Sequence, residues 1–139
     1  STTTDIQEIN NYILNLMHAY SQYLANMKEE KILDLISNAK NYIDQHLCDT
    51  DLTADSVALS MDYNATYLNR IFKSQYAMSM KEYINISRVE LAKKLLIETD
   101  LSTLEISSKL GLENSNYFYT FFKKHTGSTP NQYRIDNKT

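Results

Sequence analysis

The stretch FFKKHTGSTPNQYR, residues 121–134, decides the fold. It predicts the end of an amphipathic helix, a glycine stop at Gly127 and a new helix that begins at Pro130. A weaker copy of this stretch lies about fifty residues upstream. The two copies match at Leu52-Thr53 and Leu101-Ser102, Val57 and Ile106, Tyr67-Leu68 and Tyr117-Phe118, Phe72-Lys73 and Phe122-Lys123, and Tyr83 and Tyr133. The offset grows from 49 to 50, so one residue has been added in the second turn, residues 111–114.

Residues that break helices and strands are scarce, because the 139 residues include only two glycines and one proline. That scarcity favours helices joined by short turns over a hairpin-rich β fold. The formal net charge of −3 is divided unequally along the chain. Residues 1–49 carry seven acids and three Lys, whereas residues 50–139 carry ten acids and eleven Lys plus Arg. A nucleic-acid role therefore depends on where the basic side chains point, and not on bulk charge.

The sequence offers no catalytic or metal-binding set, so we expect no enzyme activity, no metal and no cofactor. Cys48 is the only cysteine, which excludes an intrachain disulfide and a metal site built on thiolates. His18, His46 and His125 have no metal-ligand spacing among them. No apolar run reaches the ~18 residues of a membrane span, and we expect a cytoplasmic protein. Because the chain starts at Ser1 without an initiator methionine, we expect a fragment of a longer protein or a vector remnant.

The first forty-nine residues carry two apolar stripes in different registers. The first has the alternating steps of 3 and 4 that are typical of a heptad, at Ile6, Ile9, Ile13, Leu16, Tyr20, Tyr23 and Met27. Residues 28–31, KEEK, interrupt it, and a second stripe runs from Ile32 to Leu47. This pattern predicts two helices or one bent helix. The segment Ile6–Met27 is either a dimerising or signalling helix or an amphipathic helix packed on its own domain, and the sequence leaves both open.

A first helix pair follows, with Thr53 as the N-cap of a helix that ends near Ser60. After a turn at residues 61–64, a second helix is predicted for Ala65–Tyr76. Its expected inner face is Leu68, Ile71, Phe72 and Gln75, and its outer face is Thr66, Asn69, Arg70 and Lys73. Such an outer face suits the DNA major groove, because Asn can pair with adenine, Arg with guanine, and Lys with phosphate. A solvated polar face is the alternative, and this helix taken alone favours it.

A long helix, Met80–Glu98, is predicted next, opened by a capping box that begins at Ser79. At 1.5 Å per residue it is about 30 Å long. The second helix pair then repeats the first, with Phe118, Phe121, Phe122 and His125 expected inward and Asn116, Tyr119, Thr120 and Lys123 outward. Two helix-turn-helix copies, each followed by a helix that starts at Ser79 or Thr129, are a far more specific signal than one.

The second copy resembles the C-terminal signature of the AraC/XylS family of bacterial transcription regulators. The residues that carry it are Ile106, Gly111, Tyr117, Phe118, Phe122-Lys123-Lys124, Gly127, Thr129-Pro130, Tyr133 and Arg134, with Tyr83-Ile84, Arg88, Ala92 and Leu95-Leu96 in the linker and Leu59, Tyr67-Leu68, Arg70 and Phe72-Lys73 in the first copy. The resemblance covers about residues 32–135. It implies an all-α, seven-helix domain of two helix-turn-helix subdomains joined by the linker helix, preceded by an extra N-terminal amphipathic helix. The expected divisions are 1–30, 31–78, 79–99 and 100–139.

The resemblance also implies a DNA-binding face. Its base-facing residues are Thr66, Asn69, Arg70, Ser115, Asn116, Tyr119 and Thr120, and its phosphate-contacting residues are Thr53, Asn64, Tyr67, Lys73, Ser102, Tyr117, Lys123 and Lys124. Two positions depart from the family pattern. Thr120 stands where an arginine is common, which puts guanine reading by the second helix in doubt, and Ala77 replaces the glycine that Gly127 supplies in the second copy.

The implied partners are double-stranded DNA of a promoter or operator, and RNA polymerase. A homodimer through the Ile6–Met27 helix, and an upstream sensor or receiver domain if the chain is a fragment, complete the expected partners. The rival interpretation is a helical protein-interaction or signalling module that does not bind DNA, which the net charge of −3 favours.

Overall fold

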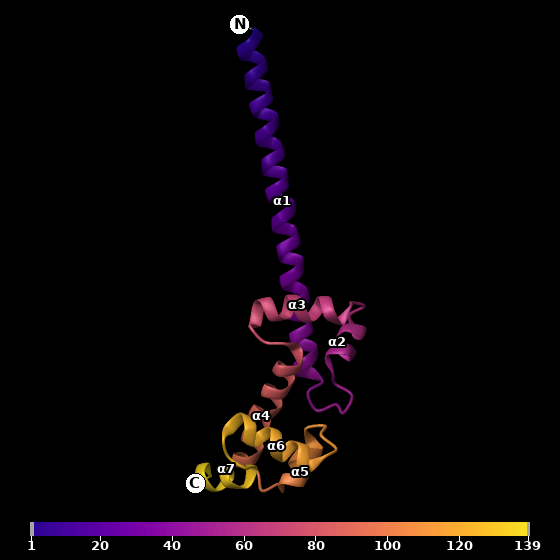
Figure 1. The fold of residues 1–139 in the computed structure, drawn as a ribbon, viewed down its shortest axis with the longest axis vertical. Helices are drawn as coiled ribbons and strands as arrows, with labels where there is room; N and C mark the ends of the chain where they lie inside the picture. The colour runs from indigo at the N-terminus through magenta and orange to yellow at the C-terminus, as the bar shows by residue number, and fades with distance from the viewer. Residues whose placement is uncertain (1, 139) are drawn as a thin grey trace. The chain divides into compact units, whose positions relative to one another are not determined.

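The computed structural model describes residues 2–138, and within them the protein is all-helical, with seven helices and no strand. The helices are α1 Thr2–Gln45, α2 Ala54–Ser60, α3 Ala65–Tyr76, α4 Met80–Glu98, α5 Thr103–Lys109, α6 Ser115–Thr126 and α7 Pro130–Asn137 (Figure 1). The predicted all-α fold is thus confirmed, and α3 and α4 have the expected bounds. The divisions after residues 30, 78 and 99 stay predictions, and the end residues 1 and 139 lie outside the described part.

The first helix, α1, is one continuous helix of 44 residues, so the two-helix alternative is wrong. Residues 28–31 are lysines and glutamates, which are strong helix formers. They interrupt the apolar stripe without interrupting the backbone, because nothing in this segment breaks a helix. The extra N-terminal segment is therefore an extension of the first helix and not a separate one. The described chain divides into two compact units, one ending at Ser37 and one beginning at Asn38.

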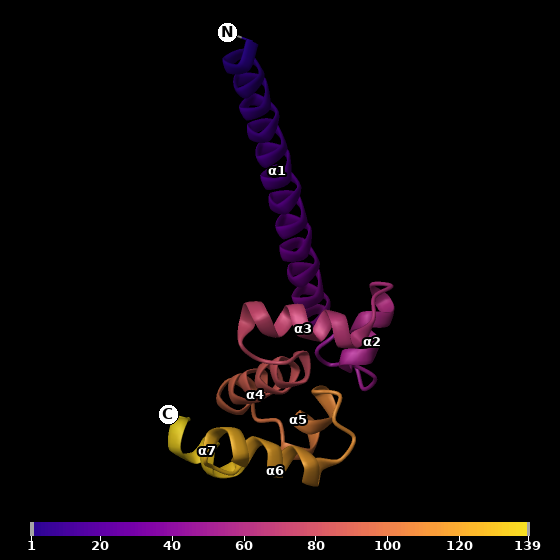
Figure 2. The ribbon, with the colours of Figure 1, turned by 45° about the horizontal axis from the view of Figure 1, so that its top comes forward.

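Within the second unit, the linker helix α4 joins the two helix-turn-helix pairs (Figures 1 and 2). Met80 and Ile84 are buried near its start, where α3 packs against it. Its later turns pack on α5, α6 and α7. The core there consists of Val89, Ala92, Leu96, Ile106, Leu110, Leu112, Phe118, Phe121 and Phe122. The helix α4 thus supplies apolar side chains to both helix-turn-helix pairs and thereby holds the two pairs together.

The sequence repeat is also a repeat of contacts. The rings of Phe72 and Tyr83 meet edge to face at 5.6 Å between centroids, and those of Phe122 and Tyr133 do the same at 5.6 Å. Residues 71–80 and 121–130 have the same succession of buried, half-buried and exposed positions. The two copies therefore build their cores in the same way.

Two of the predicted inward-facing positions are wrong. Gln75 and His125 occupy matching positions in the last turns of α3 and α6, and both side chains are exposed. The apolar face ends one turn earlier, because Phe72 and Phe122 already fill the space against the following helix. The His125 ring instead bonds the Phe121 carbonyl oxygen of its own helix through Nδ1, at 2.8 Å.

The end of α1 is held to α4 by a small polar cluster. The Tyr83 hydroxyl donates to Asp44 Oδ1 at 2.7 Å, and Lys40 Nζ lies 2.9 Å from Asp44 Oδ2. Partial burial, and then the bond to Asp44, raise the pKa of Tyr83. The bond to Asp44 likewise raises the pKa of Lys40. Both residues therefore keep their protons at neutral pH and remain donors to the carboxylate.

The two copies differ at the residue that ends α3 and α6, and this difference can be tested. Ala77 and Gly127 both adopt a left-handed conformation, with φ of 58° and 81°. For a residue with a Cβ, this region costs about 1 kcal/mol or more. We therefore expect Ala77→Gly to raise the free energy of unfolding by about 1 kcal/mol in urea titrations.

The matched control is Gly127→Ala, whose new Cβ meets no atom within 4 Å. Only the backbone penalty applies there, so we expect a loss of about 1 kcal/mol. If Ala77→Gly left stability unchanged or lowered it, the left-handed assignment at Ala77 would be wrong.

Candidate nucleic-acid interface

The outer face of α3 carries an exposed arginine, Arg70, beside an aromatic ring. Asn64 caps the helix, and its Oδ1 accepts from the Tyr67 backbone at 3.1 Å. The Arg70 guanidinium lies 5.4 Å from the centroid of the Tyr67 ring, a cation–π distance, and Tyr67 in turn stacks on Tyr63 at 6.1 Å. This aromatic pair restricts where the guanidinium can move. Thr66, Arg70 and Lys73 are exposed, as predicted.

Asn69, predicted to face a base, has a partner inside the protein. Its Oδ1 accepts the backbone N–H of Met80 at 2.9 Å, and the residue is only half exposed. A bidentate contact to adenine needs this same oxygen as an acceptor. The structure therefore binds the Asn69 side chain to the first turn of α4, whereas Thr66 and Arg70 stay exposed on the surface of α3.

The second copy lacks this bond for a chemical reason that is visible in the sequence. Tyr119 occupies the position of Asn69, and Pro130 occupies the position of Met80, each 50 residues on. Proline has no N–H, so the first residue of α7 leaves no donor for a side chain to satisfy. The pairing of Asn with a non-proline, and of Tyr with proline, is the signal that could have identified the role of Asn69.

The outer face of α6 is exposed at Asn116, Tyr119 and Thr120, with Ser115 half-buried. Asn114 caps this helix and accepts from the backbone of Asn116 and Tyr117 at 2.9 and 3.2 Å. The Thr120 hydroxyl donates to the Asn116 carbonyl oxygen at 3.0 Å, one turn back in its own helix. Its polar group is thus partly satisfied within the helix, unlike the guanidinium at the matching position of α3.

The predicted phosphate contacts are mostly surface groups. Thr53 and Ser102 are N-caps whose hydroxyl oxygens accept from Ser56 and Glu105 at 3.0 and 3.1 Å. Each hydroxyl keeps its own hydrogen to donate to a phosphate. Thr53, Asn64, Lys73, Ser102, Tyr117, Lys123 and Lys124 are exposed and Tyr67 is half-buried.

The cations divide into structural and available groups. Arg88 donates to the carbonyl oxygens of Leu47 and Asp49 at 3.0 Å each. Arg134 donates to those of Leu96 and Leu101 at 2.9 and 2.6 Å. Lys93 and Lys138 pair with Glu90 and Asp100. Among the described residues from 50 onward, the cations without an ion pair or a backbone hydrogen bond are Arg70, Lys73, Lys81, Lys94, Lys109, Lys123 and Lys124.

Arg88 is a buried structural residue whose role periodicity alone did not single out. It is 7% exposed, and burial lowers the pKa of its guanidinium. It stands on the apolar stripe of α4, four residues after Ile84 and four before Ala92. An arginine in that register could have been recognised as a buried cation that needs acceptors.

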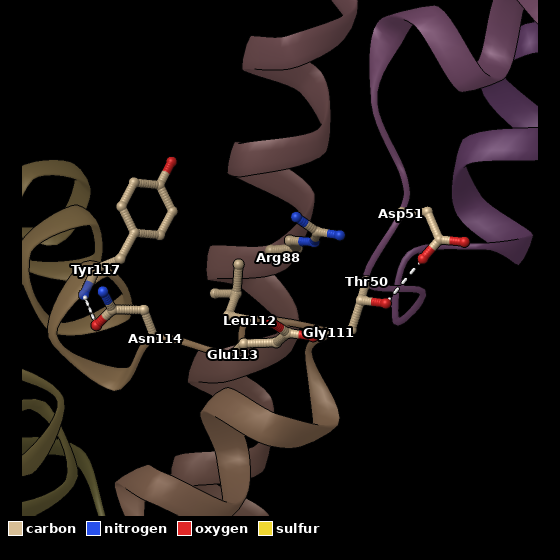
Figure 3. A pocket seen from close by; sticks show the side chains of 8 residues that line it. All are labelled: Thr50, Asp51, Arg88, Gly111, Leu112, Glu113, Asn114 and Tyr117. Carbon is tan, nitrogen blue, oxygen red and sulfur yellow. Dashed lines mark hydrogen bonds between the residues drawn. The ribbon is translucent and has the colours of Figure 1, made fainter.

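An open depression of about 460 Å³ lies beside Arg88, where the loop before α2 meets the turn of the second copy (Figure 3). Its lining consists of Thr50, Asp51, Arg88, Gly111, Leu112, Glu113, Asn114 and Tyr117. The backbones approach so closely that a Cβ on Gly111 would lie 2.6 Å from the Cys48 carbonyl oxygen. Two carboxylates on this lining disfavour a phosphate ligand. The depression is better described as the joint between the two halves.

Neither a metal centre nor a membrane span is found in the described part of the chain. Within residues 2–138 no group of three or more His, Cys, Asp or Glu side chains is placed to hold a metal ion. None of the helices in that range combines the length and apolarity that crossing a membrane requires.

Comparisons with known proteins agree with this geometry. A family model described as a helix-turn-helix domain matches residues 57–135. The HTH-type transcriptional regulator YtdP of Bacillus subtilis is 39% identical over 104 residues, which are 75% of this chain and 14% of that protein. The melibiose operon regulatory protein of Escherichia coli is 38% identical over 96 residues, which are 69% of this chain and 30% of that protein. The chain thus spans about a third or less of the length of these two relatives.

Solved structures share the fold. The C-terminal domain of AraT, a response regulator from Geobacillus stearothermophilus, superposes with a TM-score of 0.74 at 35% identity, over 76% of this chain and 87% of that one. The DNA-binding domain of AdpA, solved in complex with a target DNA, has a TM-score of 0.68 at 21% identity, over 73% of this chain and 90% of that one. The AdpA likeness shows the fold alone.

The role of Asn69 can be tested by a double-mutant cycle. Asn69→Ala leaves the Met80 N–H without an acceptor, so we expect a loss of about 1–2 kcal/mol in the free energy of unfolding. Met80→Pro removes that N–H and copies Pro130, although it also removes packing. In the Met80→Pro background we expect Asn69→Ala to cost much less, which urea titrations of the four proteins measure as a coupling energy. Equal costs in both backgrounds would refute the bond.

Proposed function

The chain belongs to the AraC family of DNA-binding transcription regulators, and we propose that it reads two successive major-groove segments of one operator with α3 and α6. The rival interpretation, a helical module that does not bind DNA, is set aside by the matched domain and by the regulators that resemble this chain. Within that family function, individual residues of α3 and α6 can be given separate roles.

The observation that carries the proposal is the state of Arg70. The sequence contains three arginines. Arg88 and Arg134 direct their guanidinium groups to backbone carbonyls. Arg70 alone is exposed, and it is steadied by Tyr67 on the outer face of α3. An exposed guanidinium with free donors is the group that best pairs with the two acceptors of guanine.

The base-reading set that this supports differs between the copies. In α3 it is Thr66 and Arg70, with Asn69 fixing the start of α4. In α6 it is Asn116 and Tyr119, which suit adenine edges or thymine methyl groups, with Ser115 and Thr120 beside them. Because Thr120 replaces an arginine, we propose that guanine is read only by the first copy. Phosphate contacts would come from Lys73, Lys123 and Lys124 and from the exposed caps Thr53, Asn64 and Ser102.

The length of α4 supports a tandem site. Its 19 residues correspond to about 28 Å at 1.5 Å per residue. One turn of B-DNA is about 34 Å, so helices held near its two ends are suited to successive major grooves. Since the two copies carry different side chains, the site would be asymmetric and not a palindrome.

The wider activity is also a proposal, because this chain spans only part of its relatives. We infer a non-enzymatic cytoplasmic regulator that acts on RNA polymerase and receives its signal from an upstream sensor or receiver domain. The description of AraT as a response regulator supports the receiver alternative.

The proposal predicts different effects for a base-reading and a phosphate-binding cation. We expect Arg70→Ala to cost about 1–3 kcal/mol on the preferred site and to flatten preference at one guanine. Lys123→Ala should weaken all sequences alike and reduce the salt slope of the logarithm of the binding constant by about one. Selection from a random DNA pool, followed by titration at several salt concentrations, measures both effects.

A gain-of-function control is Thr120→Arg, which copies Arg70 onto α6. We expect it to add a guanine preference in the second half of the selected site. If Arg70→Ala left the selected sequence unchanged, the assignment of base reading to α3 would be wrong.

A further inference from the structure

The surface that DNA reading leaves unexplained is the apolar stripe of α1. It consists of Ile6, Ile9, Ile13, Leu16, Tyr20, Tyr23 and Met27, at alternating a and d positions of three heptads. These side chains are between 47% and 63% exposed, and every residue from Thr2 to Lys31 is exposed. Met17 and Leu24, at e positions, widen the stripe and are 60% and 47% exposed.

A helix of this composition needs a partner. In proteins most helix stability comes from the packing of an amphipathic face and not from helix propensity. This helix contains β-branched, aromatic and asparagine residues, which have lower helix propensity. Within its own unit, which ends at Ser37, the positions from Thr2 to Lys31 are all exposed. Its helical order is therefore best explained by a partner along the stripe.

The stripe has a defined end. Continuing the heptad past Met27 places Glu30 at a d position and Asp34 at an a position. Charged side chains at two successive core positions terminate a coiled-coil seam. Farther along, Ala39 and Ile43 are fully buried in the second unit. The residues that suit a partner helix thus stop before those that pack on the DNA-binding unit.

The chemistry of the stripe selects a second copy of this chain over a charged partner. Between Ile6 and Met27 the only acidic or basic residue, histidine aside, is Glu8, which lies at a c position away from the seam. No charge pattern is present that would attract a basic or acidic peptide. A heptad stripe is self-complementary, and no like charges face each other across parallel g–e pairs: Asp5 meets Asn10, and Asn26 meets Lys31.

The size of the stripe is sufficient for a reversible dimer. Its 22 residues are about 33 Å long, and half the circumference of a helix about 10 Å wide is about 16 Å. Two such faces bury about 1,100 Å², just above the ~1,000 Å² that a specific interface must clear. A pair of helices alone would therefore associate weakly, in a concentration-dependent manner.

We propose that residues 6–27 of α1 pair in parallel and in register with the same residues of a second copy of this chain. Ile13 at a and Leu16 at d are the combination that favours two strands, whereas Ile6 at a and Ile9 at d also suit three or four. In a parallel, in-register pair each core residue packs against the same residue of the second copy. Tyr20 and Tyr23 therefore face tyrosines, and the isoleucines face isoleucines. The consequence for operators rests on the proposed function: two linked DNA-binding units bind neighbouring sites more tightly than either does alone.

Disulfide trapping tests the register. In a Cys48→Ser background, Ile9→Cys places two thiols at one d layer, and we expect a covalent dimer on mild oxidation. The matched control is Asn11→Cys, at an outward f position, which should stay monomeric. Equal trapping of both variants, or none of either, overturns the proposal. A dimer by mass in which Ile9→Cys is not trapped overturns the parallel register.

Sedimentation equilibrium of the full chain tests the association itself. We expect concentration-dependent dimers that Ile13→Lys, at an a position, abolishes and that His18→Lys, at an f position, preserves. A monomer at all concentrations would overturn the proposal. Binding to a single DNA site by Ile13→Lys should be unchanged, so a failure to bind DNA would count against the proposed function and not against the dimer.

Discussion

The hydrogen bonds of Arg88 are the constraint on which the DNA-binding unit depends. Its guanidinium, almost fully buried, joins the middle of α4 to the carbonyl oxygens of Leu47 and Asp49 in the loop after α1. The same loop lies closely against Gly111 of the second copy. Three segments far apart in the sequence therefore meet at one cation. Each charge-assisted bond contributes about 1.5–3 kcal/mol, and an unpaired buried guanidinium costs more.

A similar use of cations is found at the other end of α4, in the second copy. Lys138 donates to the carbonyl oxygen of Thr99, in the segment before α5, at 2.9 Å. Arg134 adds bonds to Leu96 and Leu101. Each copy thus uses a cation from the helix that follows it to hold the segment that precedes it. Because two of the three arginines are engaged in this way, little of the arginine content is left for DNA.

Much of the fold could be predicted from the sequence because its helix boundaries are written in local chemistry. Ser79 caps α4, Thr129 caps α7 and Gly127 ends α6, each within one turn, and the bounds predicted for α3 and α4 agree with those of the structure. The orientation of Asn69 was not predictable from its helix face, since its partner Met80 is eleven residues away. The continuity of α1 does not follow from periodicity, because a polar run interrupts the stripe although its residues favour helix. Periodicity locates faces, but it does not say which polar group on a face is already satisfied.

The differences between the copies show how one repeat can be specialised without changing its frame. Pro130, the first residue of α7, has no N–H that needs an acceptor. The position in α6 that is equivalent to Asn69 can therefore carry an exposed tyrosine, Tyr119. At the start of α4, the backbone N–H of Met80 donates to the Asn69 side chain. Arg70 is then the main exposed donor of α3, beside Thr66. The first residue of the following helix thus determines whether a side chain of the preceding helix is held inside the protein or left on the surface. The proposed difference between the DNA-facing residues of α3 and α6 follows from this difference at Met80 and Pro130.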